Sequence, residues 1–244
     1  MENMKSPIKM SSRLHKVADM ITPGLIVTDI GTDHGYIPIY QVLTGKAHVA
    51  YACDVAEGPL SRAADNIRLY NVGDKVKTVL SDGLCGLTDI KADAPEAIVI
   101  AGMGGSLICR ILADGSRVAA GAKELVLSPH SEWYEVRLFL QNNCYRIVDE
   151  DMLKEDGKYY VIMRAEHAGS VAEHLKDEEL KFGPVLMKKR HPVLMDYLKK
   201  EKDTCEKIKK NLADNAGESA RSKLDEFEKK EALLDGVLGK LMEV

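Results

Sequence analysis

The amino-acid sequence predicts an α/β protein: a Rossmann-like, doubly wound sheet followed by a C-terminal antiparallel helical hairpin, a coiled coil. Three observations support this class. Short apolar runs typical of buried strands alternate with segments of helical periodicity between residues 11 and 140. A glycine-containing turn follows the first of these runs. After about residue 169, strand signals cease and charged residues with coiled-coil spacing dominate.

The strands and helices are expected in regular alternation. A serine begins the first helix and Thr22-Pro23-Gly24 ends it, while Ser131 is the expected cap of the last. Right-handed crossovers would bring the carboxyl ends of the parallel strands to one edge, where such sheets bind ligands. The expected strands are 25–27, 47–54, 76–80, 97–101 and 124–127, and the expected helices are 11–21, 36–43, 57–70, one ending near 112, and 131–140.

Two further strands, 144–153 and 158–166, are expected to form a hairpin around Asp156-Gly157, a common turn dipeptide. The composition then changes. Residues 173–244 contain 16 Lys or Arg and 16 Asp or Glu, and apolar residues recur there at helical spacing on both sides of a turn at 214–218. We therefore expect a domain at 1–169 and a tail of two paired helices at 170–244.

The first turn discriminates between ligands. Dinucleotide-binding turns have the spacing G-x-G-x-x-G, whereas Gly31 and Gly35 are four residues apart. Asp29 precedes them and Asp33 lies between them, and both carboxylates would repel a pyrophosphate. They suit a cationic ligand such as S-adenosylmethionine, with its ammonium and sulfonium groups. A nicotinamide oxidoreductase is disfavoured, although an ordinary glycine turn with a solvated Asp remains an alternative.

The ends of the next strands complete a candidate nucleoside site. Asp54 ends the second strand, where a carboxylate can accept hydrogen bonds from both ribose hydroxyls. Asp82-Gly83 follows the third strand and could hold an adenine ring, although Asp-Gly is also a common turn. Gly102-Met103-Gly104 follows the fourth strand and allows a ligand to approach the backbone closely.

Composition and charge narrow the class of protein. The net charge of −4 argues against a uniformly basic nucleic-acid binder, though not against one basic face. The five cysteines are scattered without a C-x-x-C pair, which argues for a reducing compartment and against a zinc site. No apolar run approaches the roughly 18 residues of a membrane span. We expect a soluble, cytoplasmic protein without a metal.

Five motifs stand in order along the chain: Asp29-Ile-Gly-Thr-Asp-His-Gly35, Cys53-Asp-Val55, Ser81-Asp-Gly-Leu84, Ile100-Ala-Gly-Met-Gly-Gly105 and Ser128-Pro-His130. Together they resemble the bacterial tRNA (adenine(22)-N(1))-methyltransferase family, a class I S-adenosylmethionine-dependent group, over about residues 11–166, and the tail is similar in architecture. No Asn/Asp-Pro-Pro-Tyr follows the fourth strand, which disfavours chemistry at the exocyclic amine of adenine.

The resemblance implies methyl transfer to ring nitrogen 1 of an adenine in the D-arm of tRNA. That nitrogen carries its own lone pair, so positioning supplies most of the catalysis, and a carboxylate would stabilise the cationic product. The catalytic candidates are Asp33, His34, Tyr36 and His130. The expected cofactor site comprises Asp29, Gly31, Thr32, Asp33, His34, Gly35, Asp54, Val55, Asp82, Gly83, Gly102, Met103 and Gly104.

Binding of tRNA requires cations that contact phosphates. Candidates are Arg13 and Lys16 on the first helix, and Lys188, Lys189 and Arg190 at the entry to the tail, the densest basic cluster in the chain. Two other hypotheses remain open at this point: a small-molecule methyltransferase on the same fold, and a non-catalytic RNA-binding protein. The basic cluster and tail disfavour the first, and the complete set of cofactor motifs disfavours the second.

Overall fold

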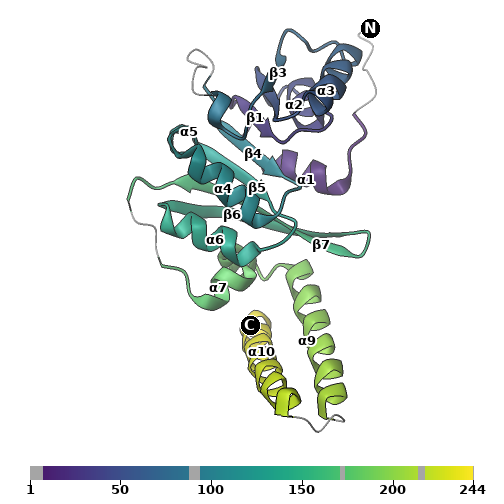
Figure 1. The fold of residues 1–244 in the computed structure, drawn as a ribbon, viewed down its shortest axis with the longest axis vertical. Coiled ribbons are helices and arrows are strands. Elements are labelled where there is room, and N and C mark those ends of the chain that lie inside the picture. The colour runs from purple at the N-terminus through teal and green to yellow at the C-terminus, as the bar shows by residue number, and fades with distance from the viewer. Residues whose placement is uncertain (1–7, 88–93, 171–173, 214–217, 244) are drawn as a thin grey trace. The chain divides into compact units, whose positions relative to one another are not determined.

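The computed structural model describes residues 8–87, 94–170, 174–213 and 218–243 of the chain (Figure 1). It divides into two compact units, Met1–His174 and Leu175–Val244.

The first unit is built on one sheet of seven strands in the order β3-β2-β1-β4-β5-β7-β6. The first five strands are parallel, and β7 pairs antiparallel with both β5 and β6. This confirms the predicted Rossmann-like fold class. The strands are β1 (Val27–Ile30), β2 (Ala50–Asp54), β3 (Val76–Leu80), β4 (Ala97–Ala101), β5 (Glu124–Ser128), β6 (Tyr145–Glu155) and β7 (Lys158–His167).

The strand order places a topological switch point between β1 and β4. The chain winds outward from β1 to β3, then returns to the other side of β1 through β4. In open α/β sheets the ligand crevice lies at the carboxyl ends of the strands beside this point. The helices are α1 (Ser12–Met20), α2 (Tyr36–Leu43), α3 (Glu57–Leu69), α4 (Gly105–Asp114), α5 (Ser116–Gly121) and α6 (Trp133–Asn142).

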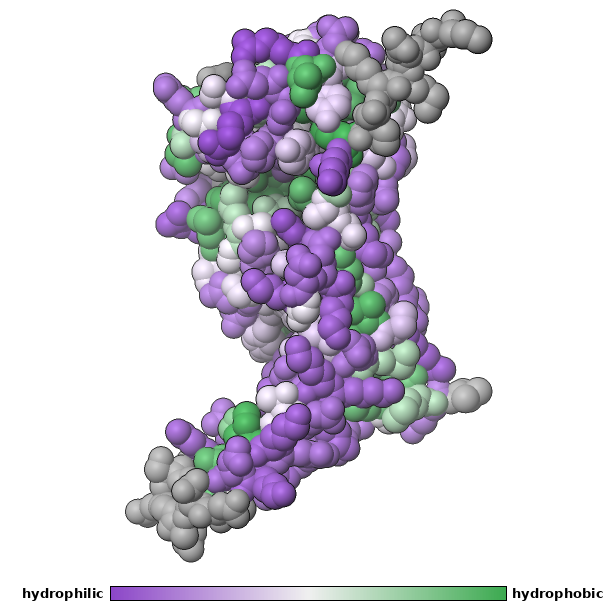
Figure 2. All heavy atoms as spheres, turned by 90° about the vertical axis from the view of Figure 1, so that its right-hand side faces the viewer, coloured by the Kyte–Doolittle hydropathy of each residue, from purple (hydrophilic) through white to green (hydrophobic). Residues whose placement is uncertain are grey.

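The core lies along the central strands. Ile98, Val99 and Ile100 of β4 are fully buried, as expected for a strand with neighbours on both edges and helices on both faces. α1 packs against α2, and α4 packs against α6. On the face in Figure 2, hydrophilic side chains predominate and hydrophobic ones form small separate groups.

Several details of the first unit differ from the expectations. β1 extends beyond the apolar run to Ile30 and so includes Asp29, and the short helix α5 was not expected. Ser131 does not cap α6; Glu132 takes that position in a left-handed conformation (φ 59°). The carboxylate of Glu132 instead caps α4, accepting from the backbone N–H of Ser106 at 2.9 Å and from its hydroxyl at 2.5 Å. This contact between separate turns has no local sequence signal.

The described residues of the second unit form four helices. The two short ones were not expected, and the two long ones form the expected antiparallel pair. Ion pairs join Lys202 to Asp235 (2.6 Å) and Lys209 to Glu231. A later residue of the first helix thus pairs with an earlier residue of the second, so the two helices run antiparallel. The buried seam includes Leu198, Cys205, Leu234 and Leu238. Of the expected turn at 214–218, residues 214–217 lie outside the described residues. The helices are α7 (Asp177–Phe182), α8 (Pro184–Lys188), α9 (Pro192–Ala213) and α10 (Glu218–Met242).

All five cysteines are free thiols. Among the described helices, none is long and apolar enough to cross a membrane. Within the same parts of the chain, no three His, Cys, Asp or Glu side chains are grouped so that they could hold a metal ion.

Candidate active site

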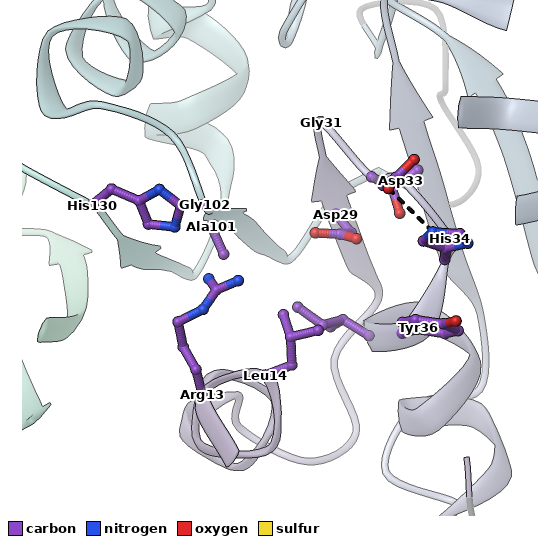
Figure 3. Close-up of a pocket in the computed structure, with 12 residues that line it drawn as sticks. Arg13, Leu14, Asp29, Gly31, Asp33, His34, Tyr36, Ala101, Gly102 and His130 are labelled. Atoms are coloured by element: carbon purple, nitrogen blue, oxygen red, sulfur yellow. Dashed lines mark ion pairs between the residues drawn. The ribbon is translucent and has the colours of Figure 1, made fainter. Parts of the chain in front are cut away.

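A cavity of about 310 Å³ opens at the switch point, between the carboxyl ends of β1 and β4 and the helix α1 (Figure 3). It brings together residues that are far apart in the sequence. The lining residues are Arg13, Leu14, Asp29, Gly31, Thr32, Asp33, His34, Tyr36, Ile37, Ala101, Gly102 and His130. Nine of these twelve were candidates from the sequence.

Asp29 is the acidic centre of the cavity. Only 7% of the residue is exposed, and burial raises the pKa of its carboxyl to about 7. A hydrogen bond with Thr32 opposes this shift, and the nearby carboxylate of Asp54 adds to it. A buried carboxylate without a cation is unfavourable, so this position favours a ligand with a positive charge.

The glycine turn lets the backbone pass close beside the cavity. Gly31 and Gly35 have φ values of +73° and +67°, which L side chains rarely adopt. The backbone N–H groups of Gly31 and Thr32 donate to the carbonyl of Cys53 at 2.8 and 2.9 Å. The turn is thereby tied to the end of β2, one residue before Asp54.

Asp33 is exposed and already has two partners. Arg62 donates through Nε to its Oδ1 at 2.9 Å, and His34 Nε2 lies 3.2 Å from its Oδ2. The His34 ring stacks on Tyr36, with centroids 5.0 Å apart and planes 12° apart. Arg62 therefore already compensates the negative charge of Asp33, the residue that the sequence analysis named as a candidate for stabilising the cationic product.

The opposite wall of the cavity carries Arg13 and His130, with the ring of Tyr160 between them. The Arg13 guanidinium lies over that ring, 5.4 Å from its centroid, and His130 meets the ring edge-on at 5.8 Å. Arg13 Nη1 is buried and makes no hydrogen bond to any residue that the structure describes. A buried donor of this kind calls for an acceptor on a ligand.

His130 lies at the exposed mouth of the cavity. Partial burial lowers its pKa from the usual 6.5, and the positive charges of Arg13 and Lys158 lower it further. The imidazole is therefore neutral at pH 7. Its backbone N–H donates to the carbonyl of Met103 at 2.8 Å, which ties the turns after β4 and β5 together.

The remaining cofactor candidates lie along the same edge of the sheet, outside the cavity lining. Asp54 Oδ1 accepts from the backbone N–H of Ala56 at 2.8 Å, which orients the carboxylate at the end of β2. The backbone N–H of Ser81 donates to the carbonyl of Asp54 at 2.9 Å, so the β2 and β3 ends adjoin. Val55 is 65% exposed beside them. Asp82, Gly83, Met103 and Gly104 follow β3 and β4 on this edge.

The candidate RNA-binding residues are dispersed. Arg13 lines the cavity, whereas Lys16 on the same helix forms an ion pair with Asp151. Lys188, Lys189 and Arg190 belong to the second unit, where they are exposed: Lys188 ends α8, and Lys189 and Arg190 follow it before α9.

Sequence reasoning missed Tyr160, Arg62 and Glu155, whose contacts reach the turns and helix around the cavity. Tyr160 has the pattern of an ordinary alternating strand residue, and Arg62 that of an exposed helix residue. The local sequence at Tyr160 and Arg62 does not indicate a role at the cavity, because each role arises from packing between distant segments.

Comparison with known proteins agrees with this geometry. The model of the tRNA (adenine(22)-N(1))-methyltransferase family matches residues 27–235. The chain belongs to this family. The chain is 32% identical to the tRNA (adenine(22)-N(1))-methyltransferase of Bacillus subtilis. The alignment covers 95% of this chain and 98% of the Bacillus subtilis protein.

Two solved structures of similar proteins carry the cofactor or its product. Streptococcus pneumoniae Sp1610 in complex with S-adenosyl-L-methionine has a TM-score of 0.82 and 32% identity, over 94% of this chain and all of that one. TrmK from M. capricolum, in complex with S-adenosylhomocysteine, has a TM-score of 0.81 and 26% identity, over 95% and 99% of the two chains.

These matches confirm three expectations: the family resemblance, the enzyme class and S-adenosylmethionine as the cofactor of this methyltransferase. They speak against the two other hypotheses, a small-molecule methyltransferase and a non-catalytic RNA-binding protein. They assign no roles to individual residues of the cavity.

Proposed function

We propose that the enzyme transfers a methyl group from S-adenosylmethionine to ring nitrogen 1 of adenine 22 in tRNA, and that the reaction takes place in the cavity between β1 and α1. One observation carries the placement. A buried acid, Asp29, and a buried, unsatisfied guanidinium N–H of Arg13 approach the same space from opposite sides (Figure 3).

The acidic side would hold the cofactor. Asp29 suits the ammonium group of its methionine end, and Gly31 lines the same cavity. Asp54 would accept hydrogen bonds from the ribose hydroxyls, and Asp82 from the adenine amine. When bound, the cofactor would supply an electrophilic methyl group, and these residues would hold it in the cavity.

The target adenine would enter from the mouth, after leaving its stack in the tRNA. Its ring nitrogen 1 attacks with its own lone pair, so no strong base is required and a neutral His130 is compatible with the reaction. His34, Tyr36 and His130 are the aromatic side chains available to stack on the base or hydrogen-bond to it. Positioning of this kind supplies most of the rate enhancement.

The methylated ring is cationic, and carboxylates of the cavity would stabilise it. Asp33 is one candidate, although it shares its charge with Arg62; Asp29 is the less compensated of the two. Arg13 would meet an anionic acceptor, either the carboxylate of the cofactor or a phosphate of the target nucleotide.

The second unit would act as a tRNA-binding arm. It carries an exposed basic turn, formed by Lys188 at the end of α8 and by Lys189 and Arg190 directly after it. Lys16 would contribute less, because Asp151 already pairs with it. An enzyme acting on tRNA would work in the cytoplasm, where its substrate is.

The decisive experiment is methylation of unmodified tRNA with a labelled methyl donor, followed by mapping of the modified nucleotide. Label should appear as 1-methyladenine at position 22. The matched control is the same tRNA carrying guanine at that position, which should accept no label. Equal labelling of both, or label at another adenine, would reject the assignment.

A further inference from the structure

The hairpin of β6 and β7 holds the N-terminus of α1. Glu155, at the end of β6, accepts through Oε1 from the backbone N–H of Ser12 at 2.7 Å and more weakly from that of Arg13 at 3.4 Å. These contacts join segments more than 140 residues apart. At a helix N-terminus a carboxylate satisfies otherwise unpaired donors and interacts favourably with the helix dipole.

The same hairpin also holds the side chain of Arg13. Tyr160, near the start of β7, provides the ring over which the Arg13 guanidinium lies at 5.4 Å. In the hairpin ladder Glu155 pairs with Lys158 and Leu153 pairs with Tyr160, so Glu155 and Tyr160 lie close together near the turn. Backbone and side chain of Arg13 are therefore both set by one hairpin.

We propose that Glu155 is a positioning residue for the methyl transfer: by capping α1 from the hairpin, it places the Arg13 guanidinium in the cavity. This inference rests on the proposed function for the role of the cavity. Arg13 Nη1 lies 3.7 Å from the position that a Cβ would occupy on Gly102, so the guanidinium is next to the turn that follows β4. A displacement of about 1 Å at such a site is enough to lower the rate strongly.

A purely stabilising cap is the competing explanation, and the chain offers a control for it. Asp151 lies on the same strand and forms an ion pair with Lys16, one turn further along α1. It links the same two elements without contacting Arg13. Loss of Asp151 should therefore loosen α1 in general, whereas loss of Glu155 should also misplace Arg13.

The test is a double-mutant cycle with Glu155→Ala and Arg13→Ala, and a parallel cycle with Asp151→Ala and Arg13→Ala. Two quantities are measured in each: the dissociation constant of S-adenosylhomocysteine by calorimetry, and kcat and KM for tRNA methylation. In the wild-type background, Glu155→Ala should weaken S-adenosylhomocysteine binding or impair tRNA methylation by about tenfold. When Arg13 is already Ala, the same substitution should have an effect of less than about twofold, because coupled sites are non-additive.

Three further readouts separate the explanations. Glu155→Gln retains an acceptor oxygen and should recover most of the loss, even if Glu155→Ala folds poorly. The Asp151 cycle should be additive. Thermal unfolding of all variants measures any shared loss of stability. Equal effects of Glu155→Ala in both Arg13 backgrounds, in both measured quantities, would overturn the proposal and leave Glu155 as a structural cap.

The cycle remains informative if the proposed function fails. S-adenosylhomocysteine binding does not depend on which nucleotide is methylated, so coupling in that measurement supports the positioning role even if adenine 22 is not the target. Coupling only in the tRNA KM supports it as well, and indicates that the acceptor for Arg13 belongs to the tRNA and not to the cofactor.

Discussion

The methyl group of Met103 occupies the space that a side chain on Gly31 would need. Met103 Cε lies 1.9 Å from the position of a Cβ built on Gly31. The two residues follow different strands, β1 and β4, and meet across the switch point. The φ of +73° favours glycine at this position, and a side chain here would also have to displace the flexible end of Met103.

We expect Gly31→Ala to weaken S-adenosylhomocysteine binding at least about tenfold and to destabilise the first unit by about 1–3 kcal/mol, from strain and overpacking together. Calorimetry and chemical unfolding measure the two effects. Adding Met103→Ala should relieve the overpacking and restore part of the stability, while the backbone strain remains. No recovery in the double variant would show that Met103 moves aside at no cost.

Cofactor affinity should depend on pH through Asp29. Its pKa is raised to about 7, and a cationic ligand group prefers the ionised form, so binding should tighten by about tenfold from pH 6 to pH 8. Asp29→Asn should abolish this dependence. Calorimetry with S-adenosylhomocysteine at several pH values is the measurement. A pH dependence that persists in the variant would assign it to another group.

The same residue should affect stability with the opposite sign. Because the folded protein raises the pKa of Asp29, it holds this proton more tightly than the unfolded chain does. Its contribution to stability is present below about pH 4 and lost as the pH rises through about 7. Without ligand, Asp29→Asn should therefore be more stable than the natural protein at pH 8, by about 2–4 kcal/mol at most. Chemical unfolding of both proteins at pH 4 and pH 8 measures the difference, and an equal difference at the two pH values would contradict the raised pKa.

Two roles of Asp33 can be distinguished: stabilising the cationic product and holding the glycine turn in place. If its charge stabilises the cationic product, Asp33→Asn should lower kcat at least about tenfold while changing cofactor affinity little. Arg62→Ala, which frees the same carboxylate from its ion pair, should leave kcat nearly unchanged. Similar small losses in both variants would indicate that Asp33 only holds the turn.

The basic turn of the second unit should determine tRNA affinity and its salt dependence. Replacing Lys188, Lys189 and Arg190 with Ala should weaken tRNA binding and lower the salt slope by about one for each phosphate that the variant no longer binds. S-adenosylhomocysteine affinity should not change. Titration of tRNA at several salt concentrations is the measurement.

A matched control replaces three exposed lysines of the first unit with Ala. One lies on β3, one just before β3 and one just before β5. These are Lys75, Lys77 and Lys123. The control should leave the salt slope close to that of the natural chain. Equal slopes in all three proteins would mean that the basic turn does not contact tRNA.

Much of the site follows from the order of residues along the chain. Alternating strands and helices bring Asp29, Asp54 and Gly102 to one edge of a sheet, because crossovers are right-handed and parallel strands end together. The turn dipeptide Asp156-Gly157 likewise specifies the β6–β7 hairpin, since both residues adopt positive φ values there. Local conformational preferences and connection rules are sufficient for these features.

Only the tertiary structure decided which side chains meet. By its sequence pattern Arg13 is a surface cation on an amphipathic helix, but the hairpin of β6 and β7 turns it into the cavity. Asp33 has the pattern of a free acid, but α3 brings Arg62 against it. The reason is physical: periodicity and turn chemistry act over a few residues, whereas the partner and pKa of a charged group depend on what packs within a few ångströms, from anywhere in the chain.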